Sequence, residues 1–88
     1  MKIEIKPMTT EQAEKDGITS WPIWTCGVSE FDWEYSDRES CFLLEGQVKV
    51  KTDRETVNFG PGDFVVFPKG LKCFWKVTSP VKKHYQFG

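Results

Sequence analysis

The chain has 88 residues, which is enough for one domain over residues 1–88 with a single modest core. Twelve Lys and Arg residues stand against thirteen Asp and Glu residues, the formal net charge is −1 at pH 7, and no basic block is present. This balance argues against a nucleic-acid partner, because nothing would neutralise a run of phosphates. Aromatic residues make up 15% of the chain, so large rings are expected to dominate the core, a pocket or an interface.

No apolar run approaches the length of a membrane span, and residues 1–6 alternate charged residues with Ile instead of forming the apolar part of a signal peptide. We therefore expect a cytoplasmic protein with no membrane partner. The three cysteines, Cys26, Cys41 and Cys73, are odd in number and lack a C-x-x-C spacing, so reduced thiols are expected.

The first residues predict one short strand and the only helix of the chain. Alternating Ile residues predict a strand over 2–6, which Pro7 ends. A helix is expected to begin at an N-cap on Thr9 or Thr10 and to end at Gly17. Its turns are mostly polar, so the helix should lie on the surface.

Residues 18–28 predict an extended edge segment, because Pro and Gly within it block a helix. Its Trp21 and Trp24 could cover an open end of a barrel or meet a second subunit. Strict alternation over 31–35 predicts a strand with its aromatic residues on one face.

The rest of the chain predicts a succession of short strands separated by Gly, Pro and charged residues. The expected strands cover residues 39–45, 48–52, 55–59, 64–67, 71–77 and 81–87. Turns are expected between them, including one at 46–47 and a break at 79–80, and the apolar run 64–67 is expected to be buried on both faces. About eight short strands predict an all-β antiparallel sandwich or small barrel.

In a small barrel alternate residues face the interior, and polar residues there are candidates for function. One register of the strand over 39–45 points Glu39 and Cys41 inward, with Cys73 facing them from a partner strand. The other register points the alternate residues inward, beginning with Ser40. The sequence pattern leaves both registers open.

Aromatic residues near these positions could line a ligand pocket, since such pockets are mostly apolar with a few polar groups. The candidates are Trp33, Tyr35, Phe74 and Trp75, and the same rings could equally belong to the core or to an interface. Cys73 is expected to be a buried thiol and not a nucleophile, because its neighbours are apolar. His84, the only histidine, is expected to be a surface or hydrogen-bonded residue and not a catalytic base.

The spacing of several residues resembles the two motifs of the cupin family. Glu39, six residues and then Gly46 resemble the second half of the first motif, and Gly62, five residues, the turn 68–70, two residues and Cys73 resemble the second. More closely, the chain resembles the small single-domain cupins (RmlC-like, DUF861) grouped with the cupin domain of ureidoglycine aminohydrolase. The resemblance implies an antiparallel jelly-roll barrel of cupin type, here with one short N-terminal helix.

The resemblance also implies where a metal would bind, and the chain departs from the family pattern at those places. Metal-binding cupins carry a His-x-His pair before the Glu and another His at the end of the second motif. Here the pair's places hold acidic or aromatic residues and the last place holds Cys73, so only Glu39 matches in kind. A site made of Glu34, Glu39 and Cys73 is chemically conceivable, but three anionic groups would compete for protons. We predict no cofactor, with a divalent transition metal as the alternative.

Three functions remain open. The first is a cupin without the usual histidine metal site that binds a small molecule in its barrel. The second is a metal-dependent enzyme of the ureidoglycine aminohydrolase kind acting on a small nitrogen-containing acid, against which the missing histidines count. The third is a non-catalytic dimeric module with a structural or regulatory role. We favour the first, expect a homodimer in addition, and leave open whether any reaction is catalysed.

Overall fold

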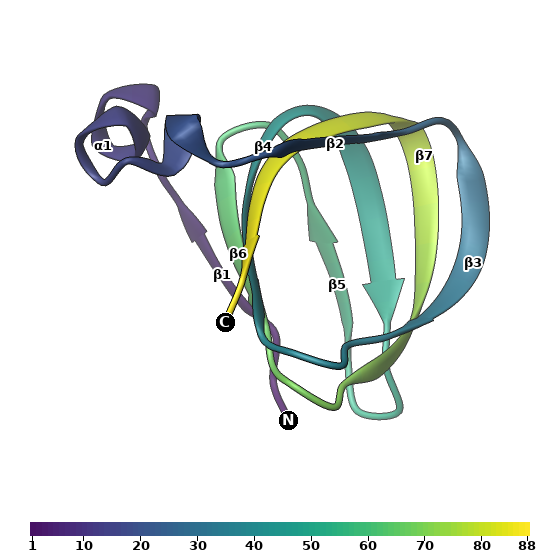
Figure 1. Cartoon of the computed structure of the whole chain (residues 1–88). Coiled ribbons are helices and arrows are strands. Elements are labelled where there is room, and N and C mark those ends of the chain that lie inside the picture. Colours follow the sequence, from purple (N-terminus) through teal and green to yellow (C-terminus); the bar gives the residue numbers. More distant parts are fainter.

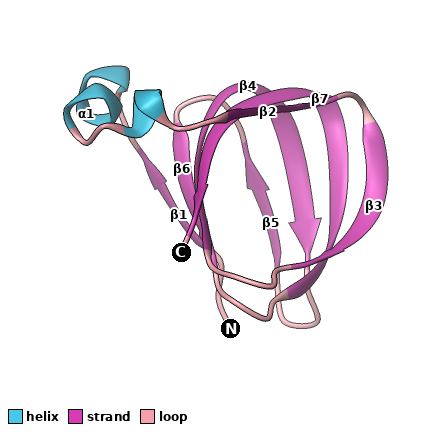
Figure 2. Ribbon diagram, in the orientation of Figure 1, coloured by secondary structure: helices cyan, strands magenta, loops and turns pink.

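The computed structural model describes all 88 residues and contains one short α-helix, one 3-10 turn and a seven-stranded sheet (Figure 1, Figure 2). No helix has the length and hydropathy that crossing a membrane requires. The elements in chain order are β1 (Glu4–Pro7), α1 (Thr10–Lys15), η1 (Ile18–Ser20), β2 (Ile23–Cys26), β3 (Ser29–Glu34), β4 (Glu39–Lys51), β5 (Thr56–Phe59), β6 (Asp63–Phe67) and β7 (Lys72–Phe87).

The sheet is antiparallel throughout and curves around an interior, and its two longest strands each pair with more than one neighbour. The strand order is β1-β6-β4-β7-β2, with β3 also paired to β7 and β5 also paired to β4. The first part of β4 pairs with β6 and its last part with β5, while β7 pairs first with β3 and then with β2. Figure 1 shows these strands curving around a common interior, with α1 to one side. The predicted all-β antiparallel barrel with one short N-terminal helix is confirmed.

Two of the predicted chain breaks are wrong, because β4 runs through 46–47 and β7 runs through 79–80. The pairing of β4 with β7 shifts register at this place, as in a β-bulge that bends the strands without ending them. Gly46 has a φ of 108°, and a Cβ there would lie 2.6 Å from the carbonyl oxygen of Pro80. Gly and Pro therefore mark a bend in two long strands, and each of these strands replaces two of the expected short ones.

The helix begins and ends as the sequence predicts. Thr9 is its N-cap, and the Thr9 side-chain oxygen accepts a hydrogen bond from the backbone N–H of Gln12. Gly17, just past the helix, has a left-handed φ of 75°. Ala13 is the buried residue of α1 and forms a small cluster with Ile18 and Phe42 on the outside of the barrel.

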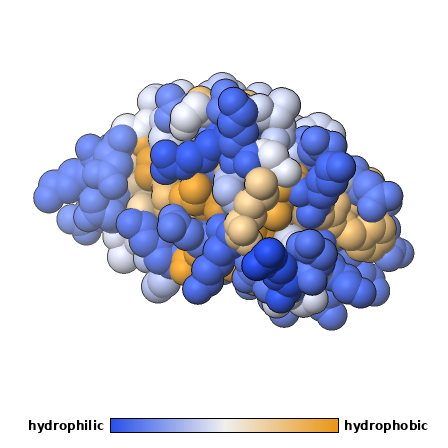
Figure 3. Space-filling view, turned by 90° about the horizontal axis from the view of Figure 1, so that it is seen from below, coloured by the Kyte–Doolittle hydropathy of each residue, from blue (hydrophilic) through white to orange (hydrophobic).

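The main core lies inside the barrel and shows which residues of β4 face inward. Cys41 and Leu43 are fully buried in this core of 14 residues, whereas Phe42 faces the helix side. In β6 the same alternation leaves Phe64 half-buried on the outer face, where the Lys6 ammonium lies 5.5 Å from its ring. The strand over 64–67 is thus fully buried on one face only, so the prediction of burial on both faces is wrong. A surface view from below shows apolar side chains gathered among polar ones (Figure 3).

Candidate functional site

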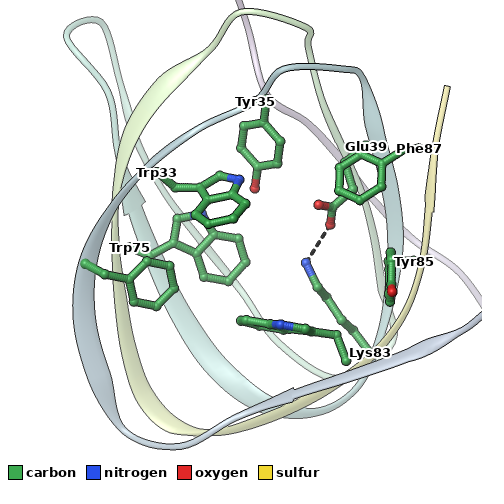
Figure 4. Close-up of a pocket in the computed structure, with 9 residues that line it drawn as sticks. Trp33, Tyr35, Glu39, Trp75, Lys83, Tyr85 and Phe87 are labelled. Carbon is green, nitrogen blue, oxygen red and sulfur yellow. Dashed lines mark hydrogen bonds and ion pairs between the residues drawn. The ribbon is translucent and has the colours of Figure 1, made fainter.

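A cavity of about 230 Å³ lies within the barrel and is bounded by side chains from β2, β3, β4 and β7 together with Tyr35. Its walls are mainly aromatic, and its two charged residues come from the two longest strands (Figure 4). The nine lining residues are Trp24, Phe31, Trp33, Tyr35, Glu39, Trp75, Lys83, Tyr85 and Phe87. Trp33 and Phe87 are each 48% exposed, so they stand at the rim of the cavity.

Glu39 and Lys83 form a buried ion pair in this cavity, with 2.6 Å between Lys83 Nζ and Glu39 Oε2. Residue 83 is paired across the sheet with Leu43, four positions along β4 from Glu39, so the long Lys83 side chain runs along the strands to reach the carboxylate. Both residues are almost completely removed from water, with 5% and 4% of their surfaces exposed. In such surroundings each charge depends on the other for its stability.

Aromatic rings surround the ammonium group of Lys83. Its Nζ lies 4.9 Å from the ring centroid of Trp24 and 4.9 Å from that of Trp75. The Phe67 ring is 5.9 Å away. These contacts place the cation against the electron-rich faces of the rings, which attract it.

Two further lining residues carry a neutral polar group. Tyr35 stacks on Phe67 with 4.7 Å between ring centroids, and burial, followed by the charge of Glu39, raises the pKa of Tyr35 above its ordinary value. The phenol is therefore protonated at neutral pH. Trp75 is 2% exposed and stacks on Phe31, and its indole Nε1 is buried without any hydrogen-bond partner.

The two cysteines predicted as site residues lie in the core and not among the residues that line the cavity. Cys41 is completely buried, and Cys73 is 7% exposed in the same core. Burial raises the pKa of the Cys41 thiol to about 12 and that of Cys73 to about 11. Both are therefore protonated at neutral pH, in keeping with the expectation that Cys73 is a buried thiol and not a nucleophile.

The residues do not fit a metal centre. Glu34 is exposed at the end of β3, while the Glu39 carboxylate is already hydrogen-bonded to Lys83. No three or more His, Cys, Asp and Glu side chains are grouped so that they could hold a metal ion. The alternative ligand set of Glu34, Glu39 and Cys73 is thus not brought together.

His84 lies outside the cavity, where its Nδ1 is 2.9 Å from the backbone carbonyl oxygen of Trp21. The expectation of a hydrogen-bonded histidine is confirmed, and the residue is buried as well. The two tryptophans of the edge segment lie in different places. Trp24 lines the cavity, whereas Trp21 packs against the cluster beside the helix.

Sequence reasoning found four of the lining residues, Trp33, Tyr35, Glu39 and Trp75, and missed Lys83. A signal for Lys83 was present. In the last strand Val81, Lys83, Tyr85 and Phe87 alternate with polar residues, so Lys83 occupies the same face as three apolar residues. That face points into the barrel, and a lysine on it has to find a partner there.

Comparison with known families and structures identifies relatives. The family model described as the EutQ-like cupin domain matches residues 13–85. A DUF861 family protein from Thermotoga maritima is 44% identical, the match covers 99% of this chain and 100% of that one, and the TM-score is 0.93. No functionally curated protein matches.

Other solved structures share the fold at lower identity. A DUF861 family protein from Pseudomonas syringae is 25% identical, with a TM-score of 0.69 over 75% of this chain and 29% of that one. A putative ethanolamine utilization protein Q from Salmonella typhimurium is 22% identical, with a TM-score of 0.67 over 99% of this chain and 69% of that one, and this likeness shows the fold alone. With a family match over most of its length and a near-identical fold at 44% identity, the chain belongs to the EutQ-like cupin family, DUF861.

Proposed function

We propose that the protein binds a small organic molecule inside its barrel, without the histidine metal site usual in cupins. The observation that carries this proposal is the aromatic cavity with one buried ion pair. Seven of the nine lining residues are hydrophobic, and the other two are Glu39 and Lys83. Binding pockets for small molecules typically combine such apolar walls with a few convergent polar groups.

The dimensions of the cavity limit the ligand to a small compound. A volume of about 230 Å³ lies below the roughly 300–1,000 Å³ of pockets that hold drug-sized ligands. The flat walls formed by Trp24, Phe31 and Trp75 favour a planar molecule, because aromatic faces gain most from stacked or edge-on contacts. A single substituted ring has the appropriate size and shape.

The four tryptophans provide the test, because three of them line the cavity and one does not. We expect saturating additions of single-ring compounds to shift the indole N–H resonances of Trp24, Trp33 and Trp75 in a heteronuclear NMR spectrum. The Trp21 resonance, outside the cavity, should stay in place and serves as the control. If no compound in a library of single-ring fragments shifts the three cavity resonances up to millimolar concentration, the proposal is wrong.

Metal analysis of the purified protein tests whether the barrel lacks a metal site. Protein purified without chelators should contain far less than one equivalent of zinc, manganese, nickel or iron. The Glu39 carboxylate is hydrogen-bonded to Lys83, and it does not belong to any group of three or more side chains that could hold a metal ion. Stoichiometric metal that disappears in the Glu39→Ala variant would instead support the metal-dependent enzyme of the ureidoglycine aminohydrolase kind.

A further inference from the structure

Lys83 is the only buried lysine of the chain. It lines the cavity, and its side chain reaches toward the Glu39 carboxylate in the space between the aromatic residues (Figure 4). Its Nζ makes one hydrogen bond, to Glu39 Oε2 at 2.6 Å. An ammonium group can donate more hydrogen bonds than this one, so the protein does not enclose the nitrogen with polar partners.

Packing alone does not explain a lysine at this position. The other residues on the same face of the last strand, Val81, Tyr85 and Phe87, are hydrophobic. A buried ion pair can often be replaced by apolar residues of similar size without loss of stability, so the fold does not require the amine. Buried lysines in apolar pockets are a class of nucleophile toward carbonyl compounds, and this gives the amine of Lys83 a chemical use.

The surroundings of the amine also suit the product of such a reaction, a protonated imine. An iminium ion carries a positive charge at the nitrogen, as the ammonium group does. The Glu39 carboxylate lies 2.6 Å from Nζ and supplies the counter-charge. The rings of Trp24 and Trp75, each 4.9 Å from Nζ, attract a cation. Conversion of the ammonium to an iminium ion therefore buries no unpaired charge.

We infer that Lys83 condenses with the aldehyde group of a small single-ring compound and forms a protonated Schiff base in the cavity. Glu39 takes a proton from the ammonium group, and the freed electron pair of Nζ forms a bond to the carbonyl carbon while the C=O π electrons move to the oxygen. A second proton passes from the nitrogen to this oxygen. Glu39 then returns its proton to the resulting hydroxyl, which leaves as water while the nitrogen electron pair forms the C=N bond. This inference rests on the proposed function and adds the chemical class of the ligand.

Reductive trapping on the full chain tests this inference. Benzaldehyde with sodium cyanoborohydride at neutral pH converts an iminium ion into a stable benzylamine, and peptide mass spectrometry then locates the benzyl group. We expect Lys83 to be modified about tenfold or more faster than Lys76, because the cavity holds the aldehyde beside the amine. Lys76 is the reference because it is an exposed lysine of the same strand. Equal rates at the two lysines would overturn the inference.

Benzyl alcohol tests whether the reaction takes place in the cavity. It has the ring of benzaldehyde but no carbonyl group, so it can occupy the cavity without reacting. At a concentration that saturates the shifts of the cavity indole resonances, it should slow trapping at Lys83 severalfold and leave trapping at Lys76 unchanged. Trapping at Lys83 that benzyl alcohol does not slow would place the reaction outside a ligand-binding cavity and overturn the inference.

A matched pair of variants tests the role of the carboxylate. Glu39→Gln retains the size of the side chain but removes the proton acceptor and the counter-charge, so trapping at Lys83 should fall about a hundredfold. Glu30→Gln, at an exposed position of β3, should react like the unaltered chain. Unchanged trapping in Glu39→Gln would contradict the mechanism. Should this variant not fold, protection by benzyl alcohol tests the inference on the unaltered chain.

The outcomes distinguish this inference from the proposed function. If benzyl alcohol shifts the cavity indole resonances but Lys83 is trapped no faster than Lys76, the Schiff base is wrong while binding in the barrel stands. If no single-ring fragment shifts these resonances and Lys83 is not trapped, both proposals fail.

Discussion

Lys83 donates to Glu39 among aromatic side chains, and both charged residues are almost completely buried. Substituting one residue of such a pair leaves the other charge buried and alone. Replacing both residues with apolar groups of similar size removes the two desolvated charges together. The contribution of the pair to stability is therefore best measured with a double-mutant cycle.

We expect Lys83→Met and Glu39→Leu each to lower the free energy of unfolding by about 3–5 kcal/mol, and the double variant to lie close to the unaltered protein. Urea denaturation followed by tryptophan fluorescence measures these values. Lys76→Met, at an exposed position of the same strand, is the matched control and should change stability by less than about 0.5 kcal/mol. Single variants as stable as this control would show that the pair is not energetically coupled.

Burial of ionisable groups in the core makes the protein sensitive to alkali. Burial raises the pKa of Cys41 to about 12 and of Cys73 to about 11 from an ordinary value of 9.0, and it raises the pKa of Tyr35 as well. Below pH 9 these groups are protonated in both the folded and the unfolded chain. Above pH 9 the unfolded chain releases thiol protons first, so stability falls as pH rises toward 11–12.

Thermal unfolding midpoints measured between pH 7 and pH 11 should therefore be steady up to about pH 9 and decline above it. The decline should be shallower in Cys73→Ser, whose hydroxyl does not titrate in this range. A midpoint that stays level from pH 8 to pH 11, or a variant that declines as steeply as the unaltered chain, would contradict this account.

At the scale of elements, β4 and β7 share a bend where their pairing shifts register. Gly46 combines a positive φ with a close approach, since a Cβ there would lie 2.6 Å from the Pro80 carbonyl oxygen and 2.7 Å from Val81 Cα. Both atoms belong to the backbone, so neither can move aside as the tip of a side chain would. Strain from the dihedral angle and the steric clash should therefore add.

We expect Gly46→Ala to lower the free energy of unfolding by about 3 kcal/mol or more. Two other glycines distinguish the effect of the positive φ from that of the steric clash. Gly17 has a positive φ but nothing within 4 Å, so Gly17→Ala should cost about 1 kcal/mol. Gly27 has neither feature, so Gly27→Ala should be close to neutral. If the three variants were equally stable in chemical denaturation, the bend would not require glycine.

At the scale of the whole molecule, we propose that two chains associate. β2 lies at one end of the strand order, so one of its edges pairs with no other strand. Ile23 in β2 is 49% exposed and Val28 beside it is 67% exposed. An unpaired edge with exposed apolar side chains is a place where a second chain can add.

Sedimentation velocity at micromolar concentration should show a dimer. Ile23→Lys should shift it toward monomer, while Asn58→Lys, at an exposed position of β5, should leave it unchanged. A monomer in the unaltered chain at these concentrations would remove the proposal of a homodimer.

The sequence by itself determined the local features. Alternation of apolar and polar residues located the strands, Thr9 and Gly17 marked the helix ends, and the spacing from Glu39 to Cys73 indicated the family. These signals are local because they depend on side-chain period, on caps and on residues with special backbone geometry. The same locality explains the errors at 46–47 and 79–80, since Gly and Pro mark a bend and a turn alike.

The tertiary structure decided what forms the site. Glu39 and Lys83 are 44 residues apart, and their pairing depends on the register of two long strands that no local pattern specifies. The same register points Lys83 toward Trp24 and Trp75, which come from different strands. The sequence could mark Glu39 as a polar residue facing inward, but only the pairing of β4 with β7 determined its partner and the cavity they share.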